Sequence, residues 1–142
     1  MRLWHRELLP YLPDLQFKGQ LRELVAIMRD VRDIGTPNHI LVNRVTEYPR
    51  RDLVVYFIEY EIEYHKRYDK WLTTQWKEFQ EFNDGVSGGV FDRWHNKEYL
   101  RVCMANLYEK HFFGIGKSRI TDEEWSKLCN GYEKITGEPY AI

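Results

Sequence analysis

The sequence contains little cysteine and no long apolar run. Only two of its 142 residues are cysteines, Cys103 and Cys129, and they do not form a Cys-x-x-Cys pair. This excludes a small disulfide-stapled domain and favours two reduced, packed thiols. Charged residues interrupt every apolar stretch, so we predict no signal peptide and no membrane-spanning segment. We therefore expect a cytoplasmic protein.

The chain also lacks an excess of charge of either sign. It has 21 Lys and Arg residues against 22 Asp and Glu residues, a formal net charge of −1. This balance argues against a surface that is basic throughout, but phosphate binding needs only a local basic patch. Residues 1–51 hold nine Lys and Arg against six Asp and Glu, whereas residues 52–84 hold four against eight. The first segment could therefore form such a patch, from Arg2, Arg6, Lys18, Arg22, Arg29, Arg32, Arg44, Arg50 and Arg51.

Length and periodicity predict an all-α fold, a single compact domain of three to five helices spanning residues 1–142. Apolar spacing, caps and breakers give the expected helices. They cover residues 14–34, 39–48, 50–82 and 97–113, with a last helix from the Thr121 capping box to residue 136. A strand over residues 40–42 is the alternative for the second segment.

Residues 1–13 are expected to form an ordered but irregular N-terminal arm. Pro10 and Pro13 disfavour an α-helix there. The apolar residues of the arm are numerous enough to anchor it against a core, and anchoring keeps a chain terminus from fraying. They are Leu3, Trp4, Leu8, Leu9 and Leu12.

The helix predicted over residues 14–34 has three distinct faces. Its apolar stripe consists of Phe17, Leu21, Leu24, Met28 and Val31. Glu23 points nearly opposite this stripe, and Gly19 and Ala26 lie one turn away on its own face. Two small neighbours leave room for another group to approach the carboxylate. A basic stripe follows Lys18, Arg22, Arg29 and Arg32.

Two later segments can be interpreted either as structural or as functional. Residues 83–92 are rich in glycine and are expected to form a loop, and Trp94 after it fits a core anchor better than a wedge into DNA. Glu59, Glu63 and His65 could suggest a metal site, but no second carboxylate–histidine set accompanies them. We expect no metal and no cofactor.

Several short sequence segments resemble those of one known family. They are Met1-Arg2-Leu3-Trp4-His5, Arg22-Glu23-Leu24, residues 38–43, residues 105–110 and, weakly, the Tyr132…Gly137…Tyr140 tail. In this order and spacing they resemble the pyrimidine dimer DNA glycosylase family (endonuclease V type). The resemblance touches most of the chain. It implies removal of a damaged pyrimidine followed by strand cleavage at the abasic site.

The resemblance also implies which residues act. The nucleophile would be the α-amine of Met1 and its partner Glu23, while Arg22, Arg2 and Lys110 would contact DNA. Where the family pattern has basic residues, this chain has Ala26 and Asn106, and the histidine that the family places before the glutamate is absent. The family usually loses its initiator methionine, but the bulky Arg2 predicts that Met1 is retained here.

The chemistry explains why these groups are needed. An α-amine has a reference pKa of about 7.7–8.0, against about 10.4 for lysine, so more of it is a neutral nucleophile at pH 7. A neutral amine can form a Schiff base with a sugar, and a carboxylate can move the protons. We add Lys18 and Arg44 as DNA contacts. The expected partner is double-stranded damaged DNA, bound by a monomer without a membrane.

Two other functions stay open at this point. The chain could be a catalytically inactive DNA-binding module of the same fold, or a helical interaction protein whose aromatic residues only form a core.

Overall fold

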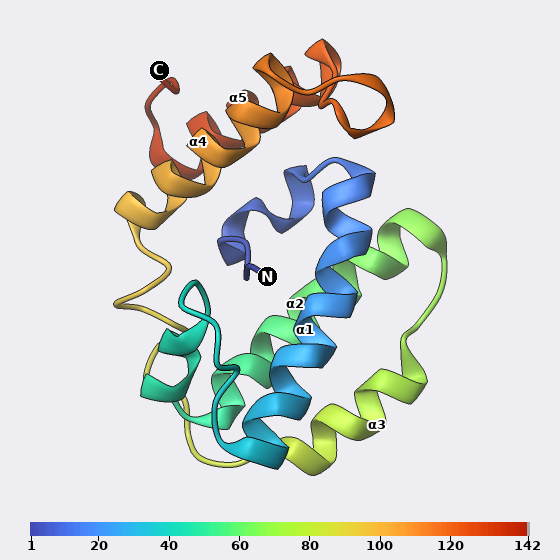
Figure 1. Cartoon of the computed structure of the whole chain (residues 1–142), viewed down its shortest axis with the longest axis vertical. Helices are drawn as coiled ribbons and strands as arrows, with labels where there is room; N and C mark the ends of the chain where they lie inside the picture. Colours follow the sequence, from blue (N-terminus) through green and yellow to red (C-terminus); the bar gives the residue numbers. More distant parts are fainter. Residues whose placement is uncertain (142) are drawn as a thin grey trace. The chain divides into compact units, whose positions relative to one another are not determined.

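The computed structural model describes residues 1–141, which contain α-helices and 3₁₀ helices and no strand (Figure 1). This confirms the all-α prediction. Contacts between residues divide the chain into two compact units. The first consists of residues 1–3 and 19–94, and the second of residues 4–18 and 95–142. Each unit is described by itself, and α1 (Asp14–Ile34) contributes residues to both.

The first unit is built from most of α1, α2 (Arg50–Tyr68), α3 (Thr73–Phe82) and the 3₁₀ helix η2 (Asn43–Glu47). The predicted apolar stripe of α1 lies only partly in the core of this unit, since Leu24 and Met28 are fully buried whereas Leu21 and Val31 are half-buried. The helix ends as predicted at Gly35, whose φ of +84° suits a residue without a side chain.

The prediction of a single helix over residues 50–82 is wrong, because the structure has two helices there, α2 and α3. Asp69 adopts a left-handed conformation (φ +54°) and ends α2. The backbone N–H of Leu72 then donates to the Glu61 carboxylate at 2.7 Å, which holds the turn. The reversal lets the Phe57 and Phe79 rings stack with centroids 4.3 Å apart. Aromatic packing therefore outweighs the local helical pattern.

The prediction of a helix over residues 39–48 is also wrong in its first half, where the chain is not helical. Only η2 is helical, and residues 38–42 form a closed loop. Asn38 has a φ of +54°, and the backbone N–H of His39 donates to the Asn43 side-chain oxygen at 2.8 Å. Side-chain hydrogen bonds to the backbone compete here with helix formation.

The second unit contains the 3₁₀ helix η1 (Arg6–Tyr11), α4 (Lys97–Phe112), η3 (Gly116–Ser118) and α5 (Asp122–Thr136). The N-terminal arm is therefore not irregular throughout, because η1 includes Pro10. The φ of about −65° that proline imposes fits a 3₁₀ helix. Leu8 and Leu9 on η1 are buried, as the predicted anchoring requires.

Helix α5 begins and packs through two local features. Thr121 and Glu124 form the predicted capping box. At Gly131, a Cβ atom would lie 2.4 Å from Cγ of Tyr11, so the absence of a side chain lets α5 approach η1. Both cysteines are free, and Cys103 is buried.

Among residues 1–141, every helix is too short or too polar to cross a membrane.

Candidate active site at the N-terminus

The first unit brings the chain's α-amine to the predicted carboxylate. The Met1 nitrogen lies 3.9 Å from Oε1 of Glu23. The other carboxylate oxygen, Oε2, accepts a hydrogen bond of 3.1 Å from the backbone N–H of Arg2. The two groups that sequence reasoning paired are thus neighbours, with one carboxylate oxygen turned toward the amine and the other bound to the next residue.

A residue that the sequence analysis missed holds this arrangement together. Gln20 is fully buried, and its amide nitrogen donates to the Arg2 carbonyl oxygen at 2.7 Å and to Oε2 of Glu23 at 3.4 Å. Its amide oxygen accepts from the Tyr56 hydroxyl at 3.1 Å. An amide within a buried helix face costs free energy unless it is hydrogen-bonded, so its position beside the apolar stripe was the available signal.

The Glu23 side chain stays partly open, at 35% exposure. No lysine or arginine side chain among the described residues forms an ion pair with it. One turn earlier, the position where Gly19 would carry a Cβ has no atom within 4 Å. The predicted room beside the carboxylate is therefore present, and a substrate group can reach both the carboxylate and the amine.

Residues 1–76 match the family model described as pyrimidine dimer DNA glycosylase. The match covers more than half of the chain and includes Met1, Gln20, Glu23 and Tyr56. The chain belongs to the pyrimidine dimer DNA glycosylase family. The family name gives DNA glycosylase as the class of activity and DNA as the substrate. A search of curated proteins and a search of solved structures each found no match.

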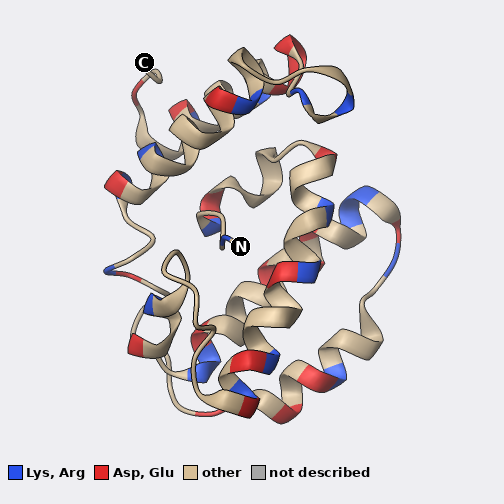
Figure 2. Cartoon of the chain, in the orientation of Figure 1, with Lys and Arg blue, Asp and Glu red and all other residues tan. Residues whose placement is uncertain are grey.

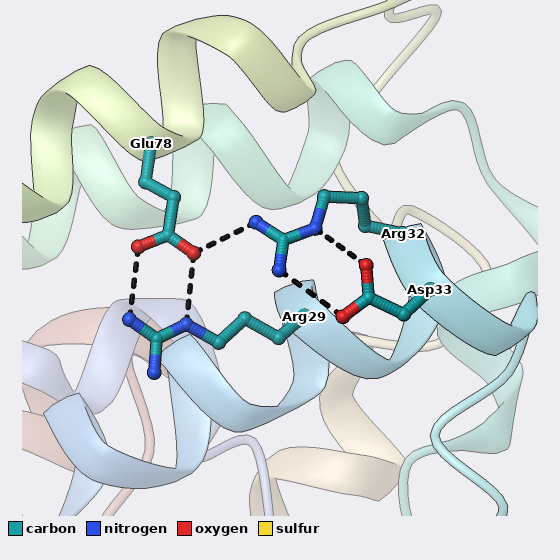
Figure 3. Close-up of polar contacts among 4 residues, drawn as sticks. All are labelled: Arg29, Arg32, Asp33 and Glu78. Atoms are coloured by element: carbon teal, nitrogen blue, oxygen red, sulfur yellow. Dashed lines mark hydrogen bonds and ion pairs between the residues drawn. The ribbon is translucent and has the colours of Figure 1, made fainter.

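Two arginines of the basic stripe expected for this DNA glycosylase are engaged within the protein (Figure 3). Arg29 forms a bidentate pair with Glu78, with nitrogen–oxygen distances of 2.8 and 2.9 Å. Arg32 contacts both Glu78 and Asp33. Hydrogen bonding from Arg29, with a further contribution from Arg32, lowers the pKa of Glu78 to about 2. This cluster links α1 to α3, so these two arginines are not the open patch that the sequence predicted.

The remaining predicted DNA contacts of the first unit differ in their surroundings. Arg22 is exposed, and no ion pair engages its side chain in the described part of the chain. Arg2 is half-buried and carries the backbone contact to Glu23. Arg44 is exposed but lies 3.3 Å from Glu47 and donates to the Arg93 carbonyl oxygen. Figure 2 shows basic and acidic residues alternating along α1 rather than one continuous basic ribbon.

The predicted contacts of the second unit are Lys18 and Lys110, both exposed. Lys110 makes no ion pair with any described residue. Asn106, which stands where the family pattern has a basic residue, donates its side-chain amide to the Val102 carbonyl oxygen at 2.8 Å. It is thus satisfied within its own helix.

The structure also describes the surroundings of two further groups of residues that the sequence analysis considered. Trp94 is 3% exposed and packs edge-on against Phe91, so it is a core anchor and not a DNA wedge. Glu63 forms an ion pair with Arg67, while the His65 ring stacks on Trp71. Residues 1–141 contain no cluster of three or more potential metal-binding side chains.

Proposed function

We propose that this chain is a DNA glycosylase with abasic-site lyase activity that acts on dimer-type or modified pyrimidines through a Schiff base on the Met1 α-amine. The observation that supports it most directly is the 3.9 Å separation of the Met1 nitrogen from the Glu23 carboxylate in an open site. The proposal includes a monomer that acts in the cytoplasm on double-stranded damaged DNA.

In the first step, the neutral amine attacks C1′ of the damaged nucleotide. The nitrogen–carbon bond forms as the glycosidic bond breaks, and the base leaves with its bonding electrons and takes up a proton. The sugar ring then opens to an iminium. Covalent catalysis of this kind divides one difficult step into two easier ones. Glu23, held on Oε2 by Arg2 and Gln20, stabilises the developing cation with Oε1.

In the second step, Glu23 removes a proton from C2′. The electrons of that C–H bond form a carbon–carbon double bond, and the C3′–oxygen bond breaks with the 3′ phosphate as leaving group. Water then hydrolyses the imine and releases Met1. A single carboxylate can serve both steps because a sugar joined to the Met1 amine would be held beside the Glu23 side chain, 3.9 Å from that amine.

The DNA contacts follow from exposure and charge. The exposed Arg22 stands beside Glu23 in sequence and can bind the phosphates that flank the lesion. Arg2, Lys18, Arg44 and Lys110 complete the proposed contact set. Access to C1′ requires a base to leave the stack, which costs least where the duplex is already damaged.

Borohydride trapping on duplex DNA with a single abasic site tests the proposal. The wild-type protein should form a covalent adduct. Selective conversion of its α-amine to a carbonyl by transamination, which leaves the lysine side chains unchanged, should abolish that adduct. Glu23→Gln should lower the single-turnover rate of strand cleavage by about 10²–10⁴-fold, the usual contribution of a general acid–base. Asp30→Asn, a carboxylate change on the same helix, is the matched control and should leave the rate unchanged.

Other outcomes of this experiment would contradict the proposal. An adduct that survives blocking of the α-amine would assign the nucleophile to a lysine. Salt-dependent DNA binding without any adduct would indicate the catalytically inactive DNA-binding module. Absence of both binding and adduct would indicate a helical interaction protein.

A further inference from the structure

Residues 38–42, which we name the finger loop, present an apolar tip to solvent. Ile40 is 86% exposed, and its neighbour Leu41 is 44% exposed. In Figure 1 the loop leaves the end of α1 and folds back to η2. Single exposed apolar residues are common, but two adjacent aliphatic side chains at the tip of one loop form a small exposed surface.

The finger loop is held closed by hydrogen bonds. The His39 carbonyl oxygen accepts from the backbone N–H groups of Val42 at 3.0 Å and Asn43 at 2.9 Å. The His39 ring accepts from the N–H of Leu41 at 3.3 Å. Val42, at the base of the loop, is fully buried. The tip is therefore presented by a braced backbone, so little conformational entropy is lost when it is inserted into a partner.

The chemistry around the tip fits DNA as the partner. No acidic residue occurs from position 34 to position 46, although acidic residues outnumber basic ones in the whole chain. The tip can therefore approach a phosphate backbone without repulsion from its own segment. The finger loop also belongs to the same compact unit as Met1 and Glu23.

We propose that Ile40, with Leu41 beside it, is a wedge that inserts into the base stack of damaged DNA and fills the space left by a displaced base. Aliphatic side chains that enter a base step partly unstack it and kink the duplex. A glycosylase needs this displacement to expose C1′, so the inference rests on the DNA substrate of the proposed function. The wedge acts on the shape of the DNA and takes no part in bond making.

The test uses a duplex that contains a tetrahydrofuran abasic analogue with 2-aminopurine opposite it. This analogue cannot form a Schiff base, so the readout does not depend on catalysis. Wild-type protein should raise 2-aminopurine fluorescence on binding. Ile40→Ser should lower both the affinity for this duplex and the fluorescence rise by about tenfold. Its affinity for the same strand without the complement should fall by less than about twofold, because a single strand has no duplex stack to open.

Val86→Ser is the matched control, because Val86 is 87% exposed on another loop of the same unit. It should behave as wild type in both measurements, and circular dichroism should show that both variants are folded.

Equal losses on duplex and single strand, or identical behaviour of Ile40→Ser and Val86→Ser, would overturn the wedge. So would a concentration-dependent dimer that Ile40→Ser dissolves, because a second copy would then cover the tip. A wild-type protein that opens the analogue duplex but forms no adduct on a true abasic site would refute the proposed chemistry and leave the wedge intact.

Discussion

At the scale of single residues, the site depends on one buried amide. Gln20 contacts the Arg2 carbonyl oxygen, the Glu23 carboxylate and the Tyr56 hydroxyl, and it is fully buried. Hydrogen bonds of this kind offset the cost of burying the amide and fix the positions of the groups they join. Gln20 is therefore a positioning residue, which acts on the substrate only through the amine and the carboxylate.

Replacing Gln20 with leucine should slow the chemistry without abolishing DNA binding. Leucine is similar in size but cannot hold the Arg2 carbonyl oxygen, so the Met1 amine loses its fixed approach to Glu23. We expect the single-turnover cleavage rate at saturating DNA to fall by about tenfold. This corresponds to an increase of about 1.4 kcal/mol in the activation free energy when the catalytic amine is misplaced. The dissociation constant for a tetrahydrofuran duplex should stay within about twofold of wild type.

A merely structural role for Gln20 would give a different result. The midpoint temperature of thermal unfolding of the variant would then decrease. Its single-turnover cleavage rate per folded molecule would stay at the wild-type value. Gln20→Glu provides a second test, since it preserves the shape of the side chain but replaces the donor amide with a carboxylate beside Glu23. It should slow cleavage most at high pH, where both carboxylates are ionised and repel each other.

At the scale of elements, the close approach of α5 and η1 depends on Gly131. A Cβ atom at this position would lie within 2.4–2.8 Å of three ring atoms of Tyr11. Helix propensity and packing therefore favour opposite residues here. Alanine is a better helix former by about 1 kcal/mol, whereas overpacking costs about 1–3 kcal/mol.

Gly131→Ala should therefore destabilise the protein despite its better helix propensity. Urea unfolding monitored by tryptophan fluorescence should show a net loss of up to about 2 kcal/mol, because the cost of moving the Tyr11 ring exceeds the gain in helix propensity. Gly19→Ala is the matched control, since no atom lies within 4 Å of its added Cβ, and it should stabilise α1 by about 0.5–1 kcal/mol. Combining Gly131→Ala with Tyr11→Ala should remove the clash, and a strictly additive loss would contradict this interpretation.

At the scale of the whole molecule, charge is balanced, and three of the nine residues of the predicted basic patch are paired with acidic side chains. Arg29 and Arg32 share Glu78, and Arg44 faces Glu47. Arg22 and Lys110, by contrast, are exposed and make no ion pair with a described residue. Affinity for DNA should then come from a few phosphate contacts together with the fit of the lesion.

The salt dependence of DNA binding should consequently be shallow. Two to five neutralised phosphates, at most one for each proposed contact, correspond to a slope of about −2 to −4.5 for the logarithm of the association constant against the logarithm of salt concentration. Fluorescence anisotropy of a tetrahydrofuran duplex from low to moderate salt measures this slope. Arg22→Ala should reduce its magnitude by about one unit, while Arg29→Ala should leave it unchanged. Equal effects of the two variants would show that Arg29 leaves Glu78 to bind DNA.

The sequence by itself determined the features that depend on near neighbours. The 3.6-residue period of α1, the stop at Gly35 and the Thr121–Glu124 capping box follow from local geometry and side-chain chemistry. The family motifs also paired Met1 with Glu23, and the structure places them 3.9 Å apart.

Tertiary structure alone decided what depends on residues distant in sequence. The break after Tyr68 lets Phe57 and Phe79 stack, the Gln20 amide meets Tyr56 from another helix, and Arg29 pairs with a glutamate 49 positions away. Local patterns state which residues can be apolar, helical or charged. They do not state which partner a buried amide or an exposed arginine meets, because that is set by how separate helices pack against one another.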